Sequence, residues 1–425
     1  MATASGSPSS ARPPRSSRAD RPHPSLLPQP VDSACIKSRR RRQMDPNGYS
    51  EAQLQIQRTV RDFARKEIAP GAEERDRTAQ FGYALYRRMG DLGIPGMLYP
   101  TELGGSDADT LSFCLAIEEV SRVDASLGFT LWIGVQGAGT LLRSAADGRE
   151  GWIDQYVRPI IRGEMVGAGA ITEPDAGSDT AAIRTRAVAH GDEWVIDGAK
   201  IYISNAGMEN CGFVTPLCRT EDGFALFLVP AGTPGYHISP PLRKMGLRSA
   251  DTRELSFDGC RVPAAHLLGG RGSGRASVVG SGFALTRVYT ASNGVGIAAE
   301  CLDVALAHAR SRIAFKRPIA QFQYVQGMLV DTAVELEAGR MLRDRAARVH
   351  TERLPFTKEA SMAKLYCTET AKRAADHAVQ VFGAMGVMDE TPVSRYYRDA
   401  RALTIAEGTS EIQKHIIARE MGCLA

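Results

Sequence analysis

The 425-residue chain changes its pattern at the stretch Gly167-Ala-Gly-Ala-Ile-Thr-Glu-Pro-Asp-Ala-Gly-Ser-Asp179. The small and apolar residues at its start predict a strand, and the Pro, Gly, Ser and Asp that follow predict a loop. This loop would present backbone N–H groups and the hydroxyls of Thr172 and Ser178. Two interpretations are open at this point: an ordinary turn, or a loop that lies against a flat polar ligand.

The residues before this stretch have a helical pattern. Ser50-x-x-Gln53 predicts a capping box, and apolar residues then recur on one helical face until Pro70-Gly71 ends the helix. Further helices are predicted near Tyr83–Leu92 and, after a Gly-Gly break, over Leu111–Ser121. The first third of the chain is therefore predicted to be helical.

The residues after it alternate with a period of two, which is typical of strands. Trp194-Val195-Ile196, Asp197-Gly198 and Lys200–Ile203 predict a hairpin with a two-residue turn. Phe224–Val229 and Glu254–Phe257 predict further strands between Gly- and Pro-rich loops. The middle third is therefore predicted to be a small β domain.

Helical periodicity returns after the glycine-rich stretch Gly269–Gly274 and continues to the end of the chain. Long helices are predicted near residues 283–313, 323–352 and 358–382, and a shorter one after Glu407. Long helices with short links favour an antiparallel bundle.

Composition and charge exclude several classes of protein. Hydrophobic residues make up 43% and charged residues 24% of the chain, as in a globular protein, and we expect no membrane span. The tail up to residue 43 has nine Lys and Arg against two Asp, so the remainder is slightly acidic although the whole chain is +4. We therefore expect no general attraction to nucleic acid.

Cysteine and histidine patterns give no sign of a disulfide framework or a metal. The eight Cys and eight His are dispersed, without CxxC or HExxH spacing, which predicts reduced thiols and no metal site. Gly270-x-Gly272-x-Gly274 has the wrong spacing for a dinucleotide-binding loop, and Gly280-Ser281-Gly282 lacks the strand–turn–helix setting of a nucleophile elbow.

The Pro-, Ser- and Arg-rich tail has no apolar periodicity, so we expect residues 1–46 to be disordered. A translation start at Met44 is an alternative. These interpretations favour a cytoplasmic protein. An organelle transit peptide shares the Arg-rich, acid-poor composition and would place the protein in the mitochondrial matrix.

Several strings, in one order, resemble the acyl-CoA dehydrogenase family, beginning with Thr172-Glu-Pro-x-Ala-Gly-Ser-Asp179. The others are Lys200-Ile-Tyr-Ile-Ser-Asn205, Lys244-Met-Gly-Leu-Arg248, Phe257-Asp-Gly-Cys-Arg-Val-Pro263, Arg312-x-x-Phe315 with Arg317-Pro318-Ile319, Gln380-Val-Phe-Gly-Ala384, Arg398-Asp-Ala-Arg401 and Ala406-Glu-Gly-Thr-Ser-Glu-Ile-Gln413. The resemblance implies an α+β fold with an N-terminal helical domain over 47–165, a β-barrel-like middle domain over 166–278 and a C-terminal four-helix bundle over 279–425.

The resemblance also implies a reaction, the oxidation of an acyl-CoA thioester to the trans-2-enoyl-CoA. A carboxylate removes the α-proton while the β-hydride passes to flavin N5, and Glu407 matches the position of that base. Burial would have to raise its pKa from the usual 4.3 or so. Some relatives carry the base instead at the position of Thr286, which cannot act as one. Taken alone, Glu407 would by default be interpreted as an exposed residue before a helix.

FAD is the cofactor that the resemblance implies, and electron-transferring flavoprotein is the implied electron acceptor. The matching FAD positions are Ile171, Thr172, Ser178, Tyr202, Ser204, Arg312, Phe315, Gln323, Gln380, Val381, Phe382, Gly383, Ala384, Thr409 and Glu411. Because Arg312, Phe315 and Gln323 match positions that reach the FAD of a neighbouring subunit, a homo-oligomer is implied, most often a tetramer.

Substrate contacts are implied at Ser178, Arg287 and Gly408. Three positions depart from the family pattern: Ala406 replaces a common Tyr, Ala284 a common Asp and Lys316 a common Gly. Ala284 leaves open an acyl group carried by a carrier protein rather than by CoA. A flavin oxidase or monooxygenase on the same fold is a further alternative, and the acidic body argues against the DNA-binding branch of the superfamily.

Overall fold

The computed structural model describes residues 47–144, 150–270, 272, 274 and 282–423. The tail predicted over residues 1–46, residues 280 and 281 of the Gly-Ser-Gly string and the domain boundary predicted after residue 278 lie outside the described residues. The described residues belong to one compact unit. The predicted limits of the three domains stay a prediction.

The N-terminal third is helical, as the sequence predicts. Its elements are α2 (Glu51–Phe63), the π-helical turn η1 (Ala64–Ile68), α3 (Ala72–Thr78), α4 (Tyr83–Asp91), η2 (Thr101–Leu103), α5 (Thr110–Val123), α6 (Ala125–Ser144), η3 (Ile153–Val157) and α7 (Arg158–Ile161). The capping box is confirmed, because the Ser50 hydroxyl accepts from the Gln53 N–H and the Gln53 side chain accepts from the Ser50 N–H.

Helix α6 was not predicted, because it is apolar on nearly all sides and has little helical periodicity. By length and composition it is the one helix among the described residues that could cross a membrane, and 67% of the relevant window is buried inside the protein. This burial is typical of a core helix, and α6 packs in the core against α5 and the first strand of the sheet.

The middle third forms a mixed nine-stranded sheet. Its strands are β1 (Val166–Ala170), β2 (Arg186–His190), β3 (Glu193–Ser204), β4 (Cys211–Thr220), β5 (Gly223–Phe227), β6 (Val229–Pro230), β7 (Tyr236–Ile238), β8 (Thr252–Pro263) and β9 (Leu267–Leu268), with the 3-10 turns η4 (Thr180–Ala182) and η5 (Ala264–His266). The strand order is β7-β8-β3-β2-β4-β5-β9, and β1 and β6 both pair with β4.

The hairpin predicted around Asp197-Gly198 is wrong. Residues 193–204 form the single strand β3, and Gly198 marks a bulge in its pairing with β8. Gly198 has φ 144°, and a Cβ there would lie 2.6 Å from the Thr185 hydroxyl, so this glycine allows close strand packing rather than a turn. The tight connection lies earlier, at Gly191-Asp192 between β2 and β3.

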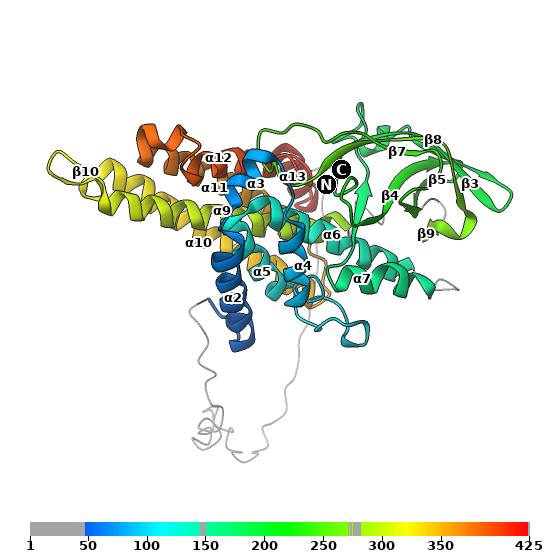
Figure 1. The fold of residues 1–425 in the computed structure, drawn as a ribbon, viewed down its shortest axis with the longest axis horizontal. Helices are drawn as coiled ribbons and strands as arrows, with labels where there is room; N and C mark the ends of the chain where they lie inside the picture. The colour runs from blue at the N-terminus through cyan, green and yellow to red at the C-terminus, as the bar shows by residue number, and fades with distance from the viewer. Residues whose placement is uncertain (1–46, 145–149, 271, 273, 275–281, 424–425) are drawn as a thin grey trace, which may run out of the picture. The chain divides into compact units, whose positions relative to one another are not determined.

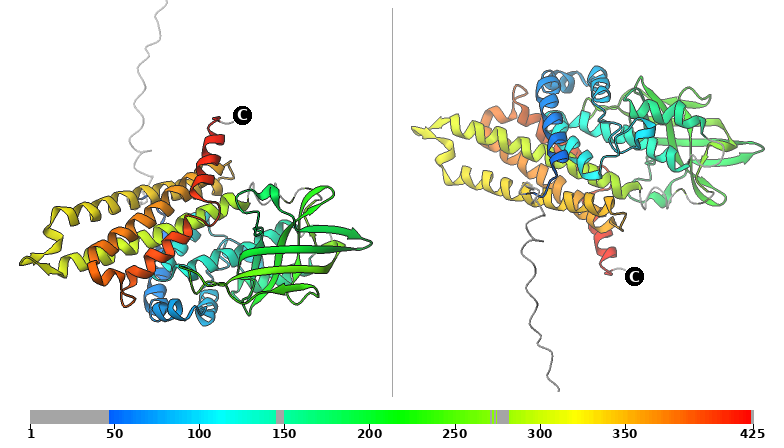
Figure 2. Two further views of the ribbon diagram at one scale, coloured as in Figure 1. Left: turned by 90° about the horizontal axis from the view of Figure 1, so that it is seen from above. Right: turned by 90° about the horizontal axis from the view of Figure 1, so that it is seen from below.

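Over residues 282–423, the last third forms three long helices and two shorter ones. They are α9 (Phe283–Ser311), α10 (Gln323–Thr351), α11 (Thr357–Phe382), α12 (Pro392–Leu403) and α13 (Ser410–Glu420), with the small hairpin β10 (Ile313–Ala314) and β11 (Arg317–Pro318), and the turns η7 (Ile319–Gln321) and η8 (Gly383–Val387). The bundle and the sheet extend in opposite directions from the N-terminal helices (Figures 1 and 2). Helix α12 was not predicted as a helix.

Helix α9 is fixed to the N-terminal helices by buried polar contacts. The Trp132 indole N–H of α6 donates to the Asn293 side chain of α9 at 2.7 Å. Arg343 of α10 and Glu118 of α5 are both fully buried and form an ion pair at 3.0 Å. Because a buried charge is costly to leave unpaired, the Arg343–Glu118 pair fixes how α10 packs on α5. The Trp132–Asn293 bond, together with the bond that the Asn293 amide donates to the Ser121 hydroxyl at 2.7 Å, joins α9 to α6 and α5.

Candidate active site

Glu407 lies on a tight turn between α12 and α13. Its φ is 58° and that of Gly408 is 94°, so two successive residues are left-handed. A non-glycine residue in this region costs about 1–3 kcal/mol, and such strain persists only where neighbouring contacts hold it. The Gln413 amide donates to the carbonyls of both Glu407 and Gly408 at 3.0 Å. The Thr409 side chain caps the start of α13.

The carboxylate of Glu407 points at the N-terminal end of α9. It is half-buried and accepts a hydrogen bond from the Thr286 hydroxyl. Burial raises the pKa of Glu407, while the Thr286 hydrogen bond and the charges of Arg287 and Lys364 act in the lowering direction. A carboxylate with a raised pKa is better matched to proton abstraction near neutral pH than a solvated one. Glu407 is therefore not the exposed residue before a helix that its position alone would suggest.

The backbone N–H of Glu407 is also available. Among the described residues it has no hydrogen-bond partner, because the turn directs the carbonyls toward Gln413 and leaves this donor unused. A free N–H beside a carboxylate can hold an oxygen atom while the carboxylate removes a neighbouring proton.

Two buried cations flank this turn. Arg287 is 3% exposed, and within the described residues its Nε has no hydrogen-bond partner. Lys364 of α11 is fully buried, and its ammonium donates to the Gly408 carbonyl at 2.7 Å. Burial lowers the pKa of Lys364 to about 7. The site thus combines one carboxylate with two cations. Among the described residues, Arg287 has no hydrogen bond or ion pair, and its guanidinium lies 5.8 Å from the centroid of the Phe283 ring.

Five of the predicted residues come from the β domain. Ile171 and Thr172 follow β1, and the Thr172 carbonyl accepts from the Ile201 N–H at 2.9 Å, which fixes the loop to β3. Tyr202 has φ 62° and is 66% exposed, and Ser204 is half-buried on the same strand. Ser178 is exposed on the loop.

A buried ion pair between Lys200 and Glu173 holds the backbone of the loop that follows β1. The Lys200 ammonium donates to Glu173 at 2.8 Å and to the Ile171 carbonyl at 3.0 Å. Glu173 in turn accepts from the N–H groups of Arg184 and Thr185. The backbone of Ile171 and Thr172 is thereby held in one conformation.

Glu411 is exposed in the first turn of α13, next to the Glu407 turn. The other predicted FAD positions, apart from Thr409, lie at the opposite end of the bundle. Arg312 and Phe315 follow α9 and Gln323 begins α10. The segment Gln380–Ala384 ends α11, where Phe382 stacks on His308 of α9 with ring centroids 4.2 Å apart. Thr286 and Arg312 are separated by nearly the whole of α9, about 40 Å at 1.5 Å per residue. One chain therefore brings Glu407, Gly408, Thr409 and Arg287 together but leaves the residues of the distal end remote from them.

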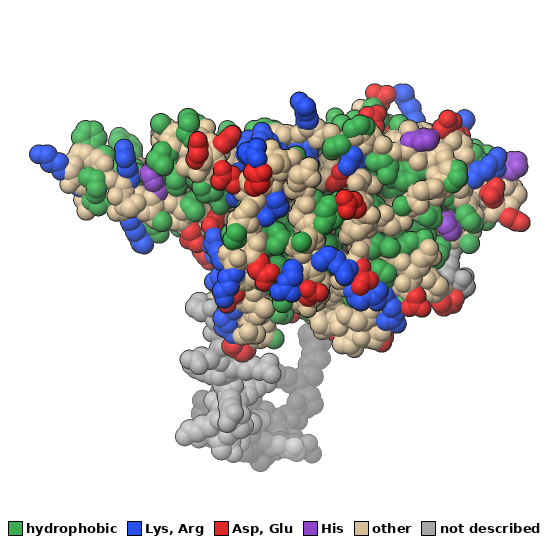
Figure 3. Space-filling model, viewed as in Figure 1, with side chains coloured by type: hydrophobic (Ala, Val, Ile, Leu, Met, Phe, Trp, Pro, Cys, Tyr) green, Lys and Arg blue, Asp and Glu red, His purple; other side chains and the backbone are tan. Residues whose placement is uncertain are grey.

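The distal end exposes large hydrophobic side chains. Phe315 is 89% and Tyr324 is 93% exposed, and Val330, Val334 and Met341 of α10 are exposed as well. Hydrophobic side chains reach the surface in this part of the bundle (Figure 3). A contiguous exposed apolar surface is typical of an interface.

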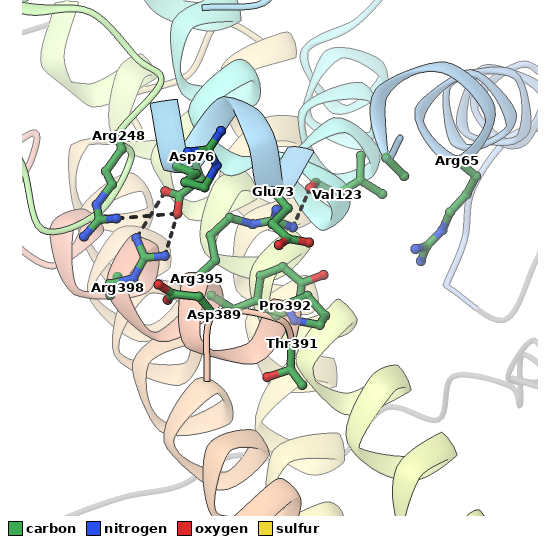
Figure 4. A pocket seen from close by; sticks show the side chains of 13 residues that line it. Arg65, Glu73, Asp76, Val123, Arg248, Asp389, Thr391, Pro392, Arg395 and Arg398 are labelled. Carbon is green, nitrogen blue, oxygen red and sulfur yellow. Dashed lines mark hydrogen bonds and ion pairs between the residues drawn. The ribbon is translucent and has the colours of Figure 1, made fainter. Parts of the chain in front are cut away.

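A pocket of about 230 Å³ lies elsewhere, where α3, α12 and the loop before β8 meet (Figure 4). Arg398 forms an ion pair with Asp76 at its wall, and Arg248 lies 3.9 Å from the same carboxylate. None of the predicted site residues lines this pocket, so we do not assign it to the Glu407 site. Among the described residues no cluster of three or more His, Cys, Asp or Glu could hold a metal.

Sequence reasoning missed Lys364 and Gln413. A signal for Lys364 was present, since it falls on the stripe of small residues Ala360, Ala363, Cys367 and Ala371 that α11 buries. A lysine at such a position must find a partner inside the protein. Gln413 lies within a predicted string, but its contact to the turn depends on the left-handed backbone, which has no sequence signal at Glu407.

Three family models match successive parts of the chain: the acyl-CoA dehydrogenase N-terminal domain over residues 50–164, the middle domain over 168–260 and the C-terminal domain over 272–422. The chain is 39% identical over 372 residues to the mitochondrial short-chain specific acyl-CoA dehydrogenase of Mus musculus, and the match covers 87% of this chain and 89% of that protein.

Solved structures agree. Butyryl-CoA dehydrogenase from Megasphaera elsdenii is 31% identical with a TM-score of 0.83, covering 88% of this chain and 98% of its own. A chain of a structure described as the electron transferring flavoprotein of Acidaminococcus fermentans is 35% identical with a TM-score of 0.84, covering 89% and 99%. The predicted α–β–α fold is thus confirmed, and the chain belongs to the acyl-CoA dehydrogenase family of flavoprotein oxidoreductases.

Proposed function

We propose that this enzyme oxidises a short-chain acyl-CoA to the trans-2-enoyl-CoA, with Glu407 as the base that removes the α-proton. The observation that carries the proposal is the Glu407 turn. There, a carboxylate with a raised pKa lies beside its own unused backbone N–H and an unpaired buried arginine.

The residues of the β domain fit FAD as the cofactor. A flat ring system needs an exposed aromatic surface and a rigid backbone of small residues beside it. Tyr202 is the exposed aromatic side chain, and the Lys200–Glu173 pair fixes the backbone at Ile171 and Thr172. When bound there, FAD supplies the acceptor for the β-hydride.

The chain's own residues account for the proton and for the thioester carbonyl. The Thr286 hydroxyl orients the Glu407 carboxylate, which takes the α-proton. The Glu407 N–H donates to the thioester oxygen, where negative charge grows as the proton leaves. Thr286 also stabilises the charged form of Glu407 and so keeps a fraction of the base ready at neutral pH.

Arg287 and the relatives support a CoA thioester as the substrate. A buried guanidinium without an anionic partner is costly, and binding of a phosphate would offset that cost. The mouse relative is short-chain specific and the Megasphaera enzyme is named for butyryl-CoA. A four-carbon acyl group is therefore the first to test.

The distal end of the bundle supports a homo-oligomer, for which we propose a tetramer. Phe315 and Arg312 cannot reach the Glu407 of their own chain across about 40 Å, and we assign them to the cofactor site of a second copy. We propose electron-transferring flavoprotein as the acceptor of the electrons, as in the family.

An anaerobic titration of the purified protein with straight-chain acyl-CoAs of increasing length, followed by flavin absorbance, tests the proposal. Bleaching by butyryl-CoA at stoichiometric amounts is the expected result. A yellow protein that no CoA ester bleaches would reject it, and bleaching by carrier-protein thioesters alone would replace CoA as the handle. Rapid consumption of O₂ during turnover without an added electron acceptor would identify an oxidase.

A further inference from the structure

We propose that Lys364 is a positioning residue for the base, which holds the Glu407–Gly408 turn and favours the charged form of the Glu407 carboxylate. This inference rests on the proposed function, because it assigns a role toward the base of that reaction.

Lys364 makes one polar contact within the described residues, and that contact is to the backbone of the turn. Its side chain is fully buried, and within the described residues its ammonium has one hydrogen bond, to the Gly408 carbonyl, and no ion pair within 4 Å. A lysine buried only to stabilise the fold would be expected to pair with a carboxylate, as Lys200 does with Glu173. Lys364 instead directs its charge at the backbone of the turn that carries Glu407.

The Lys364 contact helps to hold the conformation of the Glu407–Gly408 turn. The Glu407 and Gly408 carbonyls are both turned inward, toward Gln413 of α13, and the Gly408 carbonyl also toward Lys364 of α11. With both carbonyls held inward, the left-handed turn is fixed and the Glu407 N–H stays free. Lys364 thus ties the catalytic turn to α11, which packs along α9.

Several charged groups surround the Lys364 ammonium. The groups that face Lys364 are Glu407 on the turn, Arg287 of α9, Glu369 of α11 and Glu411 of α13. Glu369 is already paired with Lys372 and accepts from the Ser410 hydroxyl, and Glu411 is exposed. The Glu407 carboxylate, held by Thr286, is therefore the anion that gains most from the buried ammonium.

The test compares Lys364→Met and Lys364→Gln with Gln413→Leu and Lys358→Met. Lys358 is the matched control, because it lies on the same helix and has no hydrogen bond or ion pair to a described residue. Two quantities are measured on the flavin-containing protein: the pH dependence of kcat/KM for butyryl-CoA, and amide hydrogen exchange across residues 404–410 without substrate.

Glu407 must be deprotonated to act, so kcat/KM rises with pH as the carboxyl loses its proton. Removing a nearby cation raises the pKa of that carboxyl. We expect Lys364→Met to move this rising limb up by about one pH unit and to speed exchange at the turn. Gln413→Leu should speed exchange without moving the limb, because it changes no charge. Lys358→Met should do neither.

Lys364→Gln separates the two parts of the role and replaces the Met variant if that one does not fold. It removes the charge but keeps a donor, so the limb should move while exchange changes less. Unchanged limb and exchange in both Lys364 variants would overturn the proposal. If wild-type protein is not bleached by any acyl-CoA, the proposed function fails instead, and the exchange measurement still tests the contact to the turn.

Discussion

The two ends of the C-terminal bundle differ in how far their polar and hydrophobic side chains are buried and paired within the chain. At the Glu407 end, the half-buried carboxylate accepts from the Thr286 hydroxyl, and the Gln413 amide and the Lys364 ammonium hold the backbone of the turn. Two buried polar atoms there have no hydrogen-bond partner among the described residues, the Arg287 Nε and the Gln413 Oε1. At the distal end, Arg312, Phe315 and Gln323 are exposed, as is Tyr324 beside them, whereas Val381 is buried.

This difference indicates which part of the reaction each end can serve. The Glu407 end has a fixed geometry for proton transfer within one chain. At the distal end, the predicted FAD positions Arg312, Phe315 and Gln323 have no base near them in their own chain, because about 40 Å of helix separates them from Glu407. We infer that a complete active site takes its base from one chain and part of its cofactor contacts from another.

The largest effect should come from removing the base. Glu407→Gln keeps the size and hydrogen-bonding ability of the side chain but cannot take a proton, so turnover should fall by at least ~10²-fold. The flavin should stay bound, which its absorbance spectrum would show. Near-normal turnover would mean that another group is the base.

Removing the unpaired cation should mainly weaken substrate binding. Arg287→Leu deletes a charge-assisted contact, which we expect to raise KM for butyryl-CoA by about 10- to 100-fold. Arg310→Leu, at the exposed far end of the same helix, is the matched control. An equal change in both variants would show that the effect is not specific to the site.

A change at the distal end should act through assembly. Phe315→Ser removes an aromatic side chain that we place against a second copy, and the flavin should dissociate about tenfold more readily. Sedimentation and flavin release measure the two effects. A variant with wild-type assembly and flavin affinity would break the distinction between the two ends.

The smallest effect should come from Thr286→Val. The Thr286 hydroxyl stabilises the charged form of Glu407, so its loss should raise the pKa of the carboxyl further. The rising limb of the pH profile should move to higher pH, with a rate a few-fold lower at pH 6 and little change at pH 9. A shift toward lower pH would contradict the sign of this interaction.

The order of helical and β regions was predictable because hydrophobic periodicity records which face of each element is buried. The capping box at Ser50 and the helices around residues 83–92 and 283–382 illustrate this. Hydrophobic periodicity gives no prediction for an element that is buried on all sides or for a glycine that fits both a turn and a bulge. Helix α6 is buried on nearly all sides, and Gly198 could equally have made a turn or a bulge until the position of Thr185 was known.

The site was predictable only in part. The resemblance placed Glu407, but the positive φ of Glu407, the inward carbonyls and the contact from Lys364 are tertiary features. Sequence strings also could not show that the matched positions fall into two groups at opposite ends of the bundle. The roles of the individual FAD-binding residues stay predictions.

Mixed oligomers test the central claim most directly. Neither Glu407→Gln nor a double variant of Arg312→Leu and Phe315→Ser should be active alone. When the two are co-expressed and purified together, a site with Glu407 from one chain and an intact distal end from another should form. Random pairing predicts that roughly one quarter of the sites regain wild-type turnover. Activity no greater than the sum of the two separate variants would contradict an active site shared between chains.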